Sequence, residues 1–130
     1  MKLLIDTQIL IWLINEDSRL GDESLKILRS TANQINISYF SIFEMTIKAS
    51  IGKLDYDPTL LDDLPNMGID LLIPDKTTLQ NYSVYNLDNK DPFDNALIAV
   101  AIHENCAFVT SDPKILKVSV SNLKLINALQ

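Results

Sequence analysis

Short apolar runs alternate with segments of helical periodicity along the whole chain. The runs are rich in Leu, Ile and Val and have the length of buried strands, at 2–5, 35–38, 69–73, 107–110 and 123–126. The segments between them predict helices over 7–15, 22–28, 41–51, 75–82 and 91–104, with shorter ones beginning at 57 and 113. This alternation predicts one α/β domain over residues 1–130, with a parallel sheet covered by helices on both faces.

Several residues mark where these helices should begin and end. Asp22 in GDESLKIL is a predicted N-cap of the second helix. Phe43, Ile47 and Ile51 recur at helical spacing in the third, which should close at Gly52. The sequence contains no internal repeat, low-complexity segment or domain linker.

Composition agrees with a single folded domain. The chain has 130 residues, of which 47% are hydrophobic and 22% charged, which is ordinary for a globular protein. The opening MKLLIDTQILIWLI resembles a signal peptide, but Asp6 interrupts it and no small-residue cleavage site follows. We therefore expect a buried strand leading into a helix, a cytoplasmic protein and no membrane association.

Cys106 and His103 are the single residues of their types. One cysteine excludes an internal disulfide and a cysteine-based metal cluster. Cys106 lies in the apolar stretch ENCAFVT, which favours a buried, inert thiol over a reactive one. His103 has no Ser or Cys partner in a nucleophile motif, which favours a place on a helix face over a catalytic role.

The net charge of −6, from 17 acidic and 11 basic residues, argues against a large basic surface for nucleic acid. It does not exclude a nuclease, because bound divalent metals would invert the local charge where a phosphate docks.

Five carboxylates stand at strand ends and helix starts: Asp6, Glu44, Asp91, Asp94 and Asp112. In parallel sheets, sites form beyond the carboxyl ends of the strands, so these acids are expected to converge there. Gathered carboxylates repel one another unless a cation lies between them. Hard oxygen ligands suit Mg²⁺ or Mn²⁺, which clamp phosphates and activate water. The pattern therefore indicates a nuclease.

Each acid also has a simpler structural interpretation. Asp6 and Asp112 are equally well read as helix N-caps, and a cap is favoured for Asp91 because Pro92 follows it. Glu44 can pair with Lys48 one helical turn later, and Asp94 can complement a helix dipole. The combination of all five acids at strand ends is what favours a functional site.

Four ordered segments resemble PIN-domain ribonucleases, and most closely the VapC-type toxins of bacterial toxin–antitoxin pairs. The segments are LLIDTQILIWLI, ISYFSIFEMTIKASIGKL, KDPFDNALIAVA and FVTSDPKI, and the resemblance runs from residue 2 to about 126. It implies a three-layer α/β/α fold and a metal-dependent endoribonuclease acting on RNA. It also implies a cognate antitoxin as partner.

The resemblance implies roles for individual residues by position. The catalytic and metal-binding acids would be Asp6, Glu44, Asp94 and Asp112, holding Mg²⁺ or Mn²⁺. Accessory positions would be Asp91, Thr7 and Thr110.

The chain departs from the family around the DPFD motif. Members often carry a His-Arg pair before this motif and an Arg after it, where this chain has Asn89, Lys90 and Asn95. The alternative reading is therefore a catalytically degenerate PIN domain that binds RNA or protein. Lys48 and Lys90 are candidate phosphate contacts, although a solvated role is favoured for each.

A receiver-like signalling domain would also gather acids around Mg²⁺. It would need an acidic pair directly after the first strand and a Lys ending the fifth, and neither is present. The chain also carries many apolar residues on short helices, which predicts apolar interfaces with a second copy and with an antitoxin. The residues behind this prediction are Trp12, Ile42, Phe43, Leu60 and Leu61.

Overall fold

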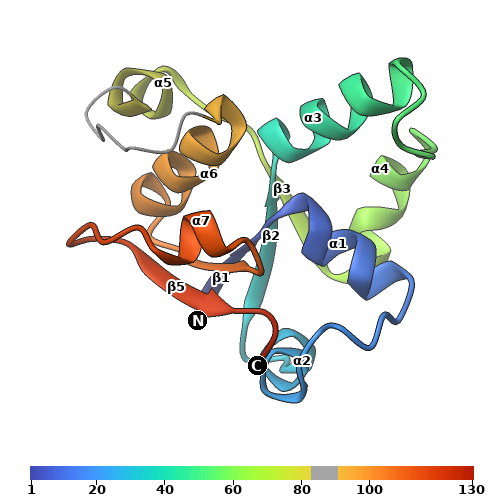
Figure 1. The fold of residues 1–130 in the computed structure, drawn as a ribbon, viewed down its shortest axis with the longest axis horizontal. Coiled ribbons are helices and arrows are strands. Elements are labelled where there is room, and N and C mark those ends of the chain that lie inside the picture. Colours follow the sequence, from blue (N-terminus) through green and yellow to red (C-terminus); the bar gives the residue numbers. More distant parts are fainter. Residues whose placement is uncertain (83–90) are drawn as a thin grey trace.

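The computed structural model describes residues 1–82 and 91–130. In these residues, five strands form one parallel sheet in the order β3-β2-β1-β4-β5 (Figure 1). The strands are β1 (Lys2–Ile5), β2 (Gln34–Ser38), β3 (Ile69–Leu72), β4 (Ala107–Thr110) and β5 (Lys124–Asn127). All of them lie within one residue of the predicted runs.

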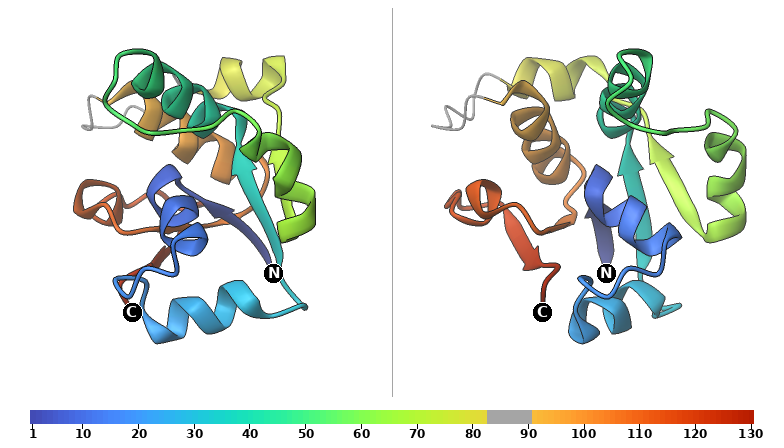
Figure 2. Two further views of the ribbon diagram at one scale, coloured as in Figure 1. Left: turned by 90° about the vertical axis from the view of Figure 1, so that its right-hand side faces the viewer. Right: turned by 45° about the vertical axis from the view of Figure 1, so that its right-hand side comes forward.

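Helices connect the strands and lie on both sides of the sheet, as the views in Figures 1 and 2 show. They are α1 (Thr7–Ile14), α2 (Asp22–Arg29), α3 (Tyr39–Ser50), α4 (Leu60–Asp63), α5 (Lys76–Tyr82), α6 (Pro92–His103) and α7 (Pro113–Leu116), with a 3-10 turn η1 (Leu64–Met67). The predicted helices are present, but the one expected to begin at residue 57 begins at Leu60 as α4, so Pro58 lies before its first turn. The turn η1 was not predicted.

Alternate residues of the central strands supply two separate cores. Leu3 and Ile5 of β1 pack with α1, α2 and α3 on one face. Leu4 of β1 and Phe108 of β4 pack with α6 and α7 on the other. Because side chains alternate along a strand, one run of apolar residues serves both faces. This confirms the predicted three-layer α/β/α architecture.

The start of α2 differs from the prediction, because Gly21 and not Asp22 is the N-cap. The N–H groups of Glu23 and Ser24 donate to the carbonyl of Gln130, at 2.8 and 3.2 Å. That carbonyl does what a capping side chain would do. A Cβ at Gly21 would overlap the backbone of Gln130, so the position has no room for a side chain.

The regular apolar spacing in α3 marks an exposed face of the helix. Phe43, Ile47 and Ile51 are 50%, 37% and 60% exposed, whereas Ile42 and Met45 are buried. The face of α3 that packs in the core, with Ile42 and Met45, is therefore not the face on which apolar residues recur most regularly. The helix ends before Gly52, as predicted, and Gly52 has a positive φ of 74°.

The surroundings of Cys106 and His103 agree with structural roles for both residues. Cys106 is buried, and burial raises the pKa of its thiol. The His103 Nε2 atom lies 3.5 Å from the Asp75 carboxylate, which joins the end of α6 to the start of α5. Within the described residues, no helix has both the length and the apolar character needed to span a membrane.

Candidate active site

Asp6 is the most buried of the candidate acids. It follows β1 and is the N-cap of α1, where its Oδ1 accepts a hydrogen bond from the N–H of Ile9 at 3.0 Å. Its Oδ2 accepts a hydrogen bond from the Thr110 hydroxyl at 2.5 Å. The side chain is nearly enclosed, and burial raises its pKa from 3.8 to about 6, against the effect of these two hydrogen bonds.

Asp112 is joined to Asp6 through Thr110. The Thr110 hydroxyl donates to Asp6 and accepts a hydrogen bond from the N–H of Asp112 at 3.1 Å. The register of β1 with β4, with Ile5 opposite Val109, brings the two strand ends side by side. Asp112 itself caps α7 by accepting from the N–H of Lys114 at 2.8 Å. One hydroxyl thus links the carboxylate of Asp6 to the backbone of Asp112, which lies far away in the sequence.

Asp91 and Asp94 come from the start of α6. Asp91 caps this helix by accepting hydrogen bonds from the N–H groups of Phe93 and Asp94, at 2.9 and 3.3 Å. The negative charges of Asp112 and Asp94 both raise the pKa of Asp6. These two carboxylates therefore lie within electrostatic range of Asp6.

Glu44 approaches the same region from the second turn of α3. Its Oε1 accepts a hydrogen bond from the Thr7 hydroxyl at 3.3 Å. Its Oε2 lies 3.7 Å from the Nζ atom of Lys48. Because Thr7 is the first residue of α1, directly after Asp6, this hydrogen bond holds Glu44 against the start of that helix.

The capping interpretation and the functional one are therefore compatible. Asp6, Asp91 and Asp112 are all N-caps, as the simpler reading proposed. Helices that follow or precede parallel strands begin near the carboxyl edge of the sheet, so a cap residue there is automatically placed at the site. The predicted Glu44–Lys48 pair is also present.

The donor chemistry suits a hard divalent cation. The side chains gathered around Asp6 carry carboxylate and hydroxyl oxygens, which Mg²⁺ and Mn²⁺ prefer. Within the described ranges, no three His, Cys, Asp or Glu side chains lie close enough together to hold one ion between them. Mg²⁺ keeps several water ligands and is commonly bound through one or two protein carboxylates, so the residues fit such a partly hydrated ion.

Of the three positions at which the sequence departs from the family, the structure describes one. Asn89 and Lys90 lie outside the described residues. Asn95 follows Asp94 in α6 and is partly buried.

The linking role of Thr110 could not be read from its local sequence, in which only a small polar residue at a strand end was apparent.

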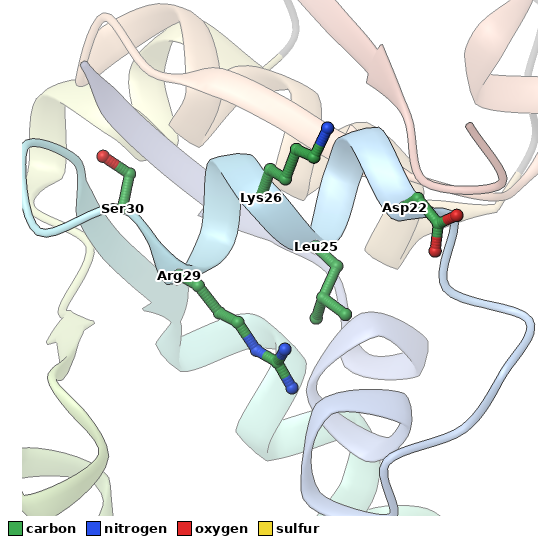
Figure 3. Close-up of a pocket in the computed structure, with 5 residues that line it drawn as sticks. All are labelled: Asp22, Leu25, Lys26, Arg29 and Ser30. Carbon is green, nitrogen blue, oxygen red and sulfur yellow. The ribbon is translucent and has the colours of Figure 1, made fainter.

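A cavity of about 510 Å³ runs along α2, apart from these acids (Figure 3). Its lining residues are Asp22, Leu25, Lys26, Arg29 and Ser30, and Leu25 and Arg29 point to the same side of the helix. None of the five candidate acids lines it, so it does not belong to the candidate site.

The chain is similar to a known protein family and to solved structures. The PIN domain family model matches residues 3–120. No protein among curated sequences matches the chain.

Solved toxin–antitoxin structures share the fold. The chain is similar to a chain of VapBC-1 from nontypeable Haemophilus influenzae, with a TM-score of 0.72, 18% identity and 100% of both chains covered. It is similar to a chain of VapBC2 from Rickettsia felis bound to a promoter DNA fragment, with a TM-score of 0.70, 22% identity and 98% of both chains covered. A toxin–antitoxin complex from Klebsiella pneumoniae gives a TM-score of 0.64 and 16% identity over 97% of both chains. With a family model that spans nearly the whole chain and a fold that agrees with it, this protein belongs to the PIN-domain family.

Proposed function

We propose that this protein is a metal-dependent endoribonuclease and the toxin of a toxin–antitoxin pair. The observation that carries the proposal is the buried Asp6 carboxylate at the end of β1, within electrostatic range of Asp94 and Asp112. Membership of the PIN-domain family and the shared fold with VapBC complexes support the same activity and the same kind of partner.

The residues proposed to hold the main Mg²⁺ or Mn²⁺ ion are Asp6, Glu44 and Asp94, one or two of them directly and the others through water molecules bound to the ion. Asp112, with Asp91 nearby, completes the site or helps to hold a second ion. When bound, the metal supplies an acidified water molecule and neutralises charge on the phosphate under attack. No His or Lys is needed as general base.

The protein's own residues orient this site. The Thr110 hydroxyl fixes Asp6 through its Oδ2 atom, and Thr7 holds Glu44. With a pKa of about 6, Asp6 is mostly ionised at neutral pH and is available to a cation. Lys48, whose side chain is half exposed beside Glu44, is a candidate contact for an RNA phosphate, although its pairing with Glu44 agrees with the solvated role favoured above.

The activity is tested with purified protein and RNA in Mg²⁺, in Mn²⁺ and in chelator. We expect cleavage with either metal, its loss in chelator and its return on metal addition. Asp6→Asn, Glu44→Gln and Asp94→Asn should each abolish cleavage, whereas Asp63→Asn, an exposed acid in α4, should not. Cleavage that persists in chelator would rule out the metal mechanism, and an equally severe His103→Ala would rule out the assigned roles.

The alternative is a degenerate PIN domain that binds RNA or a partner without cutting. It is favoured by Asn95, which stands where relatives often carry an Arg. In the same assay, this alternative predicts RNA binding with no metal-dependent product. Intact RNA bound by the unmodified protein in Mg²⁺ and in Mn²⁺ would establish it over the enzyme.

We propose a homodimer formed through the exposed face of α3. Tyr39, Phe43 and Phe93 form a chain of ring contacts there, with centroids 6.5 and 6.4 Å apart. Ile47 and Ile51 extend this apolar face along α3. Contiguous exposed apolar surface of this kind marks an interface.

Of the apolar residues that were predicted to form interfaces, some lie in the core and others on the surface. Trp12 and Ile42 are buried, whereas Phe43 and Leu61 are 50% and 36% exposed. The mass in solution at micromolar concentration tests the dimer. Phe43→Ser should give a monomer, whereas Leu129→Ser, which changes another exposed apolar residue, should not. A strictly monomeric unmodified protein would contradict the proposal.

A further inference from the structure

The segment from residue 113 to residue 130 differs in charge from the rest of the chain. It contains three Lys and no Asp or Glu, whereas residues 1–112 contain all 17 acidic residues and eight basic ones. The formal charge is thus +3 over this segment and −9 over residues 1–112. Because the segment follows Asp112 directly, the change from negative to positive charge takes place at the candidate site.

The two lysines of α7 are open to a ligand. Lys114 lies in the helix, Lys117 is its C-cap, and both residues are exposed. None of the ion pairs found within residues 1–82 and 91–130 involves either of them, whereas Lys48 lies 3.7 Å from the Glu44 carboxylate. Residues three apart in a helix are neighbours on its surface, with about 5–6 Å between their Cβ atoms. Lys114 and Lys117 therefore form one positive patch, which we call the α7 lysine pair.

The sheet places this pair on one side of the acids. The two neighbours of β1 are β2 and β4, and α7 follows β4 whereas α3 follows β2. Asp112 is the N-cap of α7, and Glu44 lies in α3. Asp6, at the end of β1, therefore lies between the starts of these two helices, and α7 is apart from α3 in the views of Figures 1 and 2. An RNA strand that crosses the acids from the α3 side continues over α7.

We propose that Lys114 and Lys117 bind backbone phosphates of single-stranded RNA on the α7 side of the acid site. At the acids, a phosphate needs a bound metal to offset the carboxylates, whereas over α7 it meets positive charge directly. Lys contacts to phosphate position a strand without reading its bases, so the pair fixes the path of the RNA and not its sequence. The inference rests on the proposed function in taking RNA as the ligand, and it applies equally to the alternative that binds RNA without cutting.

Binding is measured by fluorescence anisotropy with labelled decauridine at several salt concentrations. The protein carries Asp94→Asn, which should prevent cleavage, and Mg²⁺ is present. Lys114→Gln with Lys117→Gln should weaken binding by about tenfold. For single strands, log K falls with log[salt] by about 0.7 for each phosphate contacted, so loss of two contacts should make this slope shallower by about 1.4. Lys114→Arg with Lys117→Arg keeps both charges and should keep the affinity within about twofold.

A matched double variant separates the local effect from net charge. Lys26→Gln with Lys124→Gln also removes two exposed lysines, one from α2 and one from the start of β5. Lys124 lies opposite Ala107, at the other end of β4 from Asp112. This control should weaken binding by less than about twofold. Equal weakening by both pairs, an unchanged salt slope for the α7 pair, or no binding of decauridine at millimolar protein would each overturn the proposal. Equally tight binding of a decaglutamate peptide would show a general anion surface and refute an RNA site.

Cleavage kinetics give a second measurement, made on the protein with Asp94 intact. Phosphate contacts away from the reacting bond stabilise substrate and transition state alike, so Lys114→Gln with Lys117→Gln should raise KM about tenfold and leave kcat nearly unchanged. A fall in kcat with KM unchanged would contradict a binding role. Because the titrations do not require cleavage, the two proposals fail independently. Cleavage with no effect of the lysine pair on binding would refute this inference alone, and binding that depends on the pair without any cleavage would refute only the proposed ribonuclease activity.

Discussion

Removing the charge of Asp94 should change the stability of the fold in a way that depends on whether Asp6 is ionised. Burial, with smaller contributions from the charges of Asp112 and Asp94, raises the pKa of Asp6 from 3.8 to about 6. Such a rise corresponds to about 3 kcal/mol. Because the folded-state pKa is the higher one, stability from this group is fully present below about pH 4 and is lost as the pH rises through about 6.

The share that belongs to Asp94 is small, because its charge is the weakest of the causes that raise the pKa of Asp6. Of the roughly 3 kcal/mol of stability that is lost when Asp6 ionises, we expect Asp94→Asn to restore less than about 1 kcal/mol. An opposing effect comes from the first turn of α6, where an acid interacts favourably with the helix dipole by about 0.3–1 kcal/mol. The dipole effect is present whether or not Asp6 is ionised. The repulsion is present only when it is.

The assay is urea unfolding in chelator at about pH 5 and about pH 7.5, followed by the fluorescence of Trp12, the single tryptophan. Relative to the parent, Asp94→Asn should be less stable at the lower pH. Between the lower and the higher pH, the free energy of unfolding of the variant relative to that of the parent should rise by up to about 1 kcal/mol.

Asp63→Asn is the control, and its stability difference from the parent should not change between the two pH values. Adding Mg²⁺ at the higher pH should stabilise the parent more than Asp94→Asn, because a ligand stabilises only the state that binds it. A stability difference for Asp94→Asn that is equal at both pH values, with no response to Mg²⁺ in either protein, would refute the coupling of Asp94 to Asp6.

Three further predictions concern single residues. Thr110→Val removes the hydrogen bonds of this hydroxyl with the Oδ2 atom of Asp6 and with the N–H of Asp112. The free energy of unfolding in urea should therefore fall by about 1–3 kcal/mol at neutral pH, and an unchanged value would contradict the link. Gly21→Ala forces the backbone of Gln130 away from α2, so the melting temperature should fall by several degrees, whereas a neutral effect would mean that this contact is absent. The Cys106 thiol, buried and with a raised pKa, should react with a thiol reagent only after unfolding, and rapid labelling of the native protein would contradict its burial.

The amino-acid sequence by itself determined the order of the strands and main helices, their approximate boundaries and the α/β class. These features follow from local patterns, because apolar runs set the strands and cap residues set the helix starts. The caps at Asp6, Asp91 and Asp112 were recognisable for the same reason. Parallel topology then predicted that acids at strand ends share one edge of the sheet.

Only the tertiary structure decided which of these residues interact. The hydrogen bonds of Thr110 with both Asp6 and Asp112 depend on the pairing of β1 with β4, which local sequence does not contain. The cap of α2 is supplied by the chain near Gln130, so the local signal at Asp22 was misleading. The exposed side of α3 was decided by how the helix packs on the sheet, because periodicity identifies a face of a helix without saying what covers it.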